Sequence, residues 1–118
     1  MKLSIIIPSY NEERTVLELI CRVKKQKIPG IEKEIIVVDD GSTDNSYNIL
    51  KKIKGINLIK HEKNKGKGSA IRSGLKKANG EIILIQDADL ELNPKDYPAL
   101  IQPIIDGKSD VVYGSRLI

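Results

Sequence analysis

The clearest chemical signal in the sequence is a pair of aspartates, Asp87 and Asp89, which are separated by one residue and follow the mostly apolar run 81–85. If that run is a buried strand, both carboxylates can turn toward the same point above its end. Two close carboxylates repel each other unless a cation neutralises them, and Mg²⁺ or Mn²⁺ prefers oxygen ligands that it can share with substrate phosphates. We therefore predict a divalent-cation site at Asp87 and Asp89, to which Glu91 can add a third oxygen. The alternative is a solvated acidic loop that caps the following helix.

A further carboxylate, Asp40, follows the almost wholly apolar run 34–38 and precedes a glycine. Glycine permits a close approach of the backbone, and an acid at the end of a strand can accept hydrogen bonds from a base or a ribose. Helix capping is the alternative role for Asp40. Ser42 and Thr43 are also good helix caps, and we interpret both as structural.

Basic residues in two glycine-containing segments can meet phosphate groups. Segment 64–68 reads Asn-Lys-Gly-Lys-Gly, and its amides and the ammonium of Lys67 can lie near a diphosphate. Taken alone, such a segment is more often a solvated basic loop. Arg116 follows Gly114 and Ser115, and its planar guanidinium can pair with phosphate, whereas an ordinary surface arginine is the alternative.

The residues singled out so far follow segments with the composition of strands, and helical patterns alternate with these segments. We predict strands at 3–7, 34–38, 56–59, 81–85 and 110–113, and helices that begin near Asn11, near Tyr47, at 69–78 and at 94–105. This alternation predicts one α/β domain over residues 1–118, a Rossmann-like, mostly parallel sheet with helices on both faces. Such sheets bind ligands beyond the carboxyl ends of their strands, where the strand order reverses. The polar segments would meet there.

The sequence of segment 64–68 argues against two common nucleotide-binding motifs. The third glycine of a dinucleotide-binding motif is replaced by Ile71, which disfavours a dehydrogenase. A P-loop is disfavoured because Gly68, not serine or threonine, follows Lys67. His61 has no cysteine or second histidine to complete a zinc site, and we interpret it as a surface or loop histidine.

The composition of the chain limits the classes of partner that it is expected to bind. The net charge of +4 favours anionic partners, but the absence of Trp and Phe argues against a single-strand nucleic-acid binder. No apolar run approaches the roughly 20 residues that cross a bilayer, so we expect no signal peptide or membrane span. A single cysteine, Cys21, cannot form an internal disulfide, which favours a cytoplasmic location.

Several motifs in order resemble family 2 glycosyltransferases of the GT-A type: 5–12 (Ile-Ile-Ile-Pro-Ser-Tyr-Asn-Glu), 37–44 (Val-Val-Asp-Asp-Gly-Ser-Thr-Asp), 64–68, 87–90 (Asp-Ala-Asp-Leu) and 114–116. Within that family the chain is most similar to dolichyl- and polyprenyl-phosphate sugar transferases. The resemblance implies that Asp87 and Asp89 act in catalysis and bind the metal and the diphosphate, and that Ala88 contributes a backbone contact. It further implies phosphate binding by Arg116 and nucleoside binding by five residues: Pro8, Tyr10, Glu12, Val38 and Asp40.

By the same resemblance, the expected reaction is an inverting transfer of mannose or glucose from GDP-mannose or UDP-glucose. The expected acceptor is a polyprenyl phosphate at the cytoplasmic face of a membrane. Enzymes of this family continue well beyond the Gly-Ser-Arg segment at 114–116. A nucleotide-sugar-binding module without transfer activity therefore remains an alternative function. We also expect the chain to form a homo-oligomer.

Overall fold

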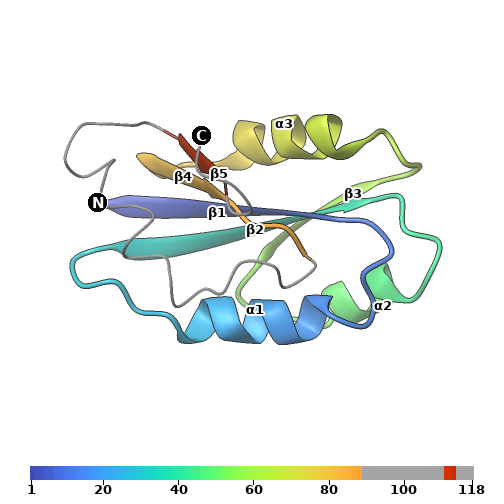
Figure 1. Ribbon diagram of the computed structural model, residues 1–118, viewed down its shortest axis with the longest axis horizontal. Coiled ribbons are helices and arrows are strands. Elements are labelled where there is room, and N and C mark those ends of the chain that lie inside the picture. The colour runs from blue at the N-terminus through green and yellow to red at the C-terminus, as the bar shows by residue number, and fades with distance from the viewer. Residues whose placement is uncertain (89–110, 114–118) are drawn as a thin grey trace.

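The computed structural model describes residues 1–88 and 111–113. In this part of the chain a parallel sheet has the strand order β3-β2-β1-β4-β5 (Figure 1). The predicted α/β class is confirmed. The elements are β1 (Lys2–Ser9), α1 (Val16–Lys25), β2 (Glu32–Asp40), α2 (Ser46–Leu50), β3 (Asn57–His61), α3 (Lys67–Lys77), β4 (Ile82–Ile85) and β5 (Val111–Tyr113).

Helices cover both faces of the sheet, as the sequence predicts. In Figure 1, α1 and α2 lie below the sheet and α3 lies above it. Ile5, Ile7 and Leu19 belong to the larger buried cluster, whereas Ile36 and Ala70 belong to a smaller one. Seven consecutive residues of β1 are buried, because this strand is central in the sheet and both of its faces are covered.

A glycine allows α3 to lie close to the sheet. A Cβ atom added at Gly74 would lie only 2.5 Å from Cγ2 of Ile6 on β1. Any larger residue would therefore push the helix away from the strand or displace the isoleucine. The position of α3 matters for function because its first turn borders the candidate site.

Three strands, β1, β2 and β3, extend beyond their predicted carboxyl ends. β1 continues through Pro8 to Ser9, two residues beyond its predicted end at residue 7. The carbonyl of Ile6 accepts a hydrogen bond from Gln86, so Pro8, two residues on, turns its missing N–H toward the side where pairing with β4 has already ended. β2 likewise continues to Asp40, two residues beyond its predicted end at residue 38.

The first helix begins later than predicted. α1 starts at Val16, and Asn11 does not cap it. Asn11 has φ 52°, a left-handed conformation that asparagine tolerates better than most residues. Its side-chain oxygen accepts hydrogen bonds from the amides of Thr43 and Asp44, at 2.8 and 3.3 Å. The asparagine therefore joins two loops. Among the helices of residues 1–88, none has the length and apolar character needed to cross a membrane.

Candidate nucleotide-binding site

A cavity opens at the carboxyl ends of β1, β2 and β4, where β1 separates the two halves of the sheet and the strand order reverses. Its volume of about 310 Å³ lies at the lower end of the range for small-molecule sites. Seven of the ten residues predicted to bind a nucleotide sugar line it. These are Pro8, Tyr10, Glu12, Asp40, Lys67, Asp87 and Ala88, and Ser9, Asn64 and Ala70 complete the lining.

Val38 is the one other predicted site residue within the described part of the chain, and it does not line this cavity. Val38 is fully buried and packs in the small cluster with Ile36 and Ala70. Neither the side chain nor the main chain of Val38 is exposed to a ligand in this structure. Asp89, Glu91 and Arg116 lie outside the described residues. Within residues 1–88 and 111–113, no group of three or more His, Cys, Asp or Glu side chains could hold a metal ion.

Asp87 already has a cationic partner at the cavity. The ammonium of Lys67, the first residue of α3, forms an ion pair with Oδ1 of Asp87. The Asp87 residue is only 9% exposed, whereas the Lys67 side chain is about half exposed. A metal cation would suit the same place, because it is positive like the ammonium and because a carboxylate oxygen is a ligand that hard cations prefer. Asp87 is therefore a suitable first ligand for the predicted divalent ion.

Thr15 secures the segment that follows β4. Its hydroxyl lies 2.7 Å from the carbonyl oxygen of Ala88 and 3.2 Å from Oε2 of Glu12. Thr15 stands at the N-cap position of α1 but makes no capping hydrogen bond. Sequence reasoning did not select Thr15, because nothing in the sequence links it to a residue 73 positions away.

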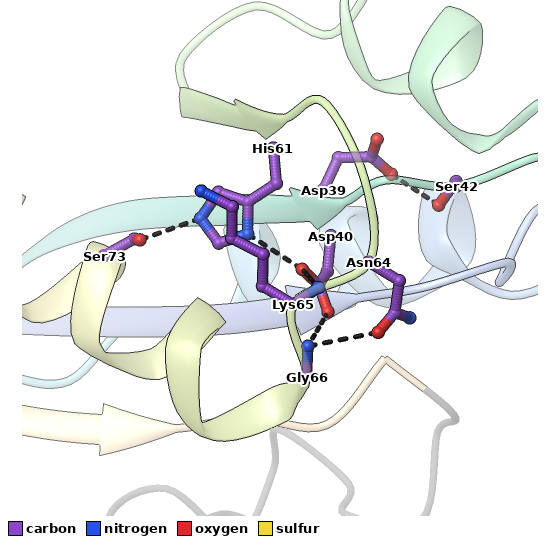
Figure 2. Close-up of polar contacts among 8 residues, drawn as sticks. All are labelled: Asp39, Asp40, Ser42, His61, Asn64, Lys65, Gly66 and Ser73. Carbon is purple, nitrogen blue, oxygen red and sulfur yellow. Dashed lines mark hydrogen bonds and ion pairs between the residues drawn. The ribbon is translucent and has the colours of Figure 1, made fainter.

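Asp40 is held by donors from two directions. Its Oδ1 accepts hydrogen bonds from Nδ1 of His61 at 2.8 Å and from the amide of Lys65 at 2.9 Å, and Oδ2 accepts from the amide of Gly66 at 2.9 Å (Figure 2). Burial raises the pKa of the Asp40 carboxyl, but these hydrogen bonds outweigh burial and hold the pKa below its usual value. Asp40 is therefore an ionised carboxylate whose position is fixed.

The structure corrects the interpretation of His61 as a surface or loop histidine. His61 is the last residue of β3, is only 8% exposed, and contacts Ser73 of α3 through Nε2 at 2.8 Å. β3 extends two residues beyond its predicted end, so His61 stands beside Asp40 in register. A single polar histidine after an apolar run carries no sign of this pairing, which depends on strand register.

The loops beside the site are tied together by side-chain hydrogen bonds. Ser42 accepts from the amide of Asn11 at 3.0 Å and donates to Asp39, so its predicted structural role is supported although it caps no helix. Gly41 has φ +71°, and a Cβ there would lie 2.3 Å from the carbonyl carbon of Lys63. Only glycine allows these two loops to meet so closely.

Three charged residues therefore lie around a single cavity: Asp40 at the end of β2, Asp87 after β4 and Lys67 at the start of α3. The family described as "Glycosyl transferase family 2" matches residues 4–118. The chain belongs to glycosyl transferase family 2. Its fold is accordingly that of the GT-A glycosyltransferases found among similar solved structures.

Relatives of this family 2 chain include sugar transferases. It is 38% identical over 121 residues to a dolichol-phosphate mannosyltransferase of Pyrococcus furiosus, an alignment that covers 100% of the chain and 34% of the relative. The crystal structure of S. aureus TarS 1-349 with UDP-GlcNAc is 40% identical, has a TM-score of 0.70, and is matched by 86% of the chain over 31% of its own length.

A second structural neighbour has a different nucleotide and a metal. The mannosyltransferase PcManGT from Pyrobaculum calidifontis, in complex with GDP-Man and Mn²⁺, is 30% identical with a TM-score of 0.69, covering 74% of the chain and 27% of that protein. The family 2 chain spans between about a third and a half of the length of the first curated relatives that it matches.

Proposed function

We propose that this family 2 chain binds a nucleoside-diphosphate sugar in the cavity and takes part in transferring the sugar to a polyprenyl phosphate. The observation that carries the proposal is the convergence of Asp40, Lys67 and Asp87 on one cavity at the switch point of the sheet. Each offers chemistry for a different part of the donor: an acceptor for the nucleoside, a cation for phosphate and an oxygen ligand for a metal.

The nucleoside would lie against β1 and β2. Among the described residues, Oδ2 of Asp40 accepts one hydrogen bond, from Gly66. A carboxylate oxygen can accept two, so it can receive a second from an N–H of a base or an O–H of a ribose. Tyr10 is 43% exposed at the cavity and offers an aromatic face to a base. Uracil and guanine both carry a ring N–H, which agrees with the UDP-GlcNAc and GDP-Man bound by two structural neighbours.

The diphosphate would lie between α3 and the end of β4. Lys67 and Ala70, both in the first turn of α3, border the cavity, and the N-terminus of a helix favours anions through its free amides and its dipole. The ammonium of Lys67 can turn from Asp87 to a phosphate. Arg116 is proposed to add a bidentate contact.

Asp87, together with Asp89 and Glu91, would hold a Mg²⁺ or Mn²⁺ ion. When bound, such an ion would neutralise the charge that accumulates on the departing diphosphate. Mn²⁺ is present in the PcManGT complex. In this chain, Asp87 and Asp89 would supply carboxylate oxygens to the ion, and the hydrogen bond from Thr15 to the carbonyl of Ala88 holds the residue that follows Asp87.

The acceptor is proposed from the relatives, since one is named a dolichol-phosphate mannosyltransferase. A lipid phosphate is already an anion at neutral pH, so its oxygen can attack the anomeric carbon without a general base, with inversion at that carbon. The reaction would take place at the cytoplasmic face of a membrane. The rival function is binding of a nucleotide sugar without transfer.

A transfer assay tests the proposal. The chain is incubated with GDP-[¹⁴C]mannose or UDP-[¹⁴C]glucose, Mn²⁺ and a short polyprenyl phosphate, and organic-phase label is counted. We expect label that Asp87→Asn lowers by at least about a hundredfold, since it removes charge stabilisation in the transition state. Glu18→Gln, an exposed change on α1, is the control and should leave transfer unchanged. Donor binding without transferred label would favour the rival function.

A further inference from the structure

A chain of side chains runs beneath the cavity from α3 to β2. Ser73 Oγ lies 2.8 Å from Nε2 of His61, and Nδ1 of His61 lies 2.8 Å from Oδ1 of Asp40 (Figure 2). Asp40 lines the cavity, but His61 and Ser73 do not. The histidine can therefore influence a bound ligand only through the carboxylate that it contacts.

The order Ser73, His61, Asp40 matches that of a nucleophile, a base and an acid, but the surroundings do not suit nucleophilic catalysis. Ser73 lies in the middle of α3, where neighbouring amides are used within the helix and cannot form an oxyanion hole. The carboxylate of Asp40 also accepts two main-chain amides, which fixes it for a structural or binding task. The chain of contacts therefore serves to position Asp40.

His61 differs from the other two donors to Asp40 in the structural element to which it belongs. The amides of Lys65 and Gly66 belong to the loop between β3 and α3, outside the regular elements. His61 stands at the end of β3, is buried, and is braced by Ser73 on α3. It therefore fixes the carboxylate relative to the sheet, and the carboxylate in turn fixes the two loop amides beside the start of α3.

We propose that His61 is a positioning residue for the nucleoside of the donor, acting through Asp40. The inference rests on the proposed function, because it requires Asp40 to contact a nucleotide. In this role, His61 orients the carboxylate of Asp40 so that Oδ2 can accept a hydrogen bond from the nucleoside. The same contact sets the loop 62–66 and the first turn of α3, so the nucleoside and phosphate regions share one support.

The arrangement holds in both protonation states of the imidazole. Nδ1 donates to Asp40 in either state. The hydroxyl of Ser73 donates to Nε2 when the ring is neutral and accepts from it when the ring is charged. Ser73 is therefore a partner that keeps the ring oriented without fixing its charge.

Two substitutions separate the two contacts of His61. In His61→Asn, the amide nitrogen occupies the place of Nδ1, so donation to Asp40 is kept and the contact with Ser73 is lost. In His61→Gln, the amide reaches the place of Nε2, so the contact with Ser73 is kept and donation to Asp40 is lost. Any general loss of packing affects both variants, whereas a loss of positioning affects the glutamine variant more.

The test measures the Kd for UDP and GDP, with Mn²⁺, by calorimetry on the wild-type chain and on both variants, with thermal unfolding recorded for each. We expect His61→Gln to weaken binding about tenfold, the usual effect of losing one hydrogen bond to a charged group, and His61→Asn to stay within about threefold of wild type. Equal Kd values for the two variants, at equal folded fractions, would overturn the proposal. So would an unchanged Kd in His61→Gln.

His61 is the only histidine of the chain, so its ring signals in an NMR spectrum are unambiguous. We expect them to shift when nucleotide is added to the wild-type chain, and to shift less in Ser73→Ala, which keeps His61. Ring signals that stay fixed while nucleotide binds would contradict the positioning role, even if the His61 variants fail to fold. If the wild-type chain binds no nucleotide, the proposed function itself fails, and the positioning role fails with it.

Discussion

The hydroxyl of Thr15 donates a hydrogen bond of 2.7 Å to the carbonyl oxygen of Ala88. This contact joins the residue before α1 to the segment after β4, and no strand pairing connects these two places. Ala88 is only 4% exposed, so water cannot readily replace the threonine. Because Ala88 follows Asp87, the contact holds the main chain directly after that carboxylate.

Thr15→Val should therefore destabilise the chain and weaken donor binding. A buried carbonyl without a donor costs about 1–3 kcal/mol in the free energy of unfolding. Thr15→Ser keeps the hydroxyl and is the matched control. Urea unfolding and nucleotide titration should show a defect in the valine variant and a much smaller one in the serine variant. Similar behaviour of the two would show that the methyl group matters and the hydrogen bond does not.

Lys67 should compete with a divalent cation for Asp87, since its ammonium forms an ion pair with that carboxylate. Lys67→Ala is expected to raise the affinity of the nucleotide-free chain for Mn²⁺ severalfold, because removing a positive charge favours the binding of another. The same variant should bind UDP or GDP less tightly. Manganese binding is measured by electron paramagnetic resonance, and Lys63→Ala removes a nearby loop charge as a control. Weaker Mn²⁺ binding in Lys67→Ala would contradict this competition.

Two glycines of α3 should respond oppositely to alanine. Gly74→Ala places a Cβ 2.5 Å from Ile6, and overpacking of this kind costs about 1–3 kcal/mol, more than the roughly 1 kcal/mol gained in helix propensity. At Gly68 the nearest group is the side chain of Arg72 at 3.6 Å, so alanine should leave stability unchanged or raise it. Thermal unfolding of the two variants gives the comparison. A stable Gly74→Ala chain would mean that α3 can move away from the sheet at little cost.

Acid should destabilise the chain partly through Asp40. Its folded-state pKa lies below the ordinary value of 3.8, so its contribution to stability is fully present above that value and is lost as the pH falls through the lower folded-state pKa. Asp40→Asn should be less stable than wild type at pH 7 and should lose less further stability on acidification. Urea unfolding between pH 7 and pH 2.5 measures both slopes. Parallel slopes would show that the hydrogen bonds do not favour the ionised carboxylate.

The sequence predicts the sheet well because its strands are short apolar runs followed by polar turns. Asp40 and Asp87 could be placed at one edge for the same reason: the carboxyl ends of parallel strands lie together. Element ends were less predictable. Pro8 continues β1 because its missing N–H faces a side without pairing, and that depends on the length of β4.

Residues that act through another residue could not be predicted from the sequence. His61 and Thr15 have no motif of their own, and their partners lie 21 and 73 positions away. Strand register brings His61 to Asp40, and the packing of α1 brings Thr15 to Ala88. Local patterns of hydrophobicity do not encode such distant pairings.

The cavity between β1, β2 and β4 is proposed to bind a nucleoside diphosphate with the help of a divalent cation. Calorimetric titration of the chain with UDP, GDP, UDP-glucose and GDP-mannose, first with Mn²⁺ and then with EDTA, tests this claim most directly. We predict saturable binding of one base series, weakened at least about tenfold by EDTA and by Asp87→Asn. Absence of binding with Mn²⁺ present, or equal binding in EDTA and in Asp87→Asn, would contradict the claim.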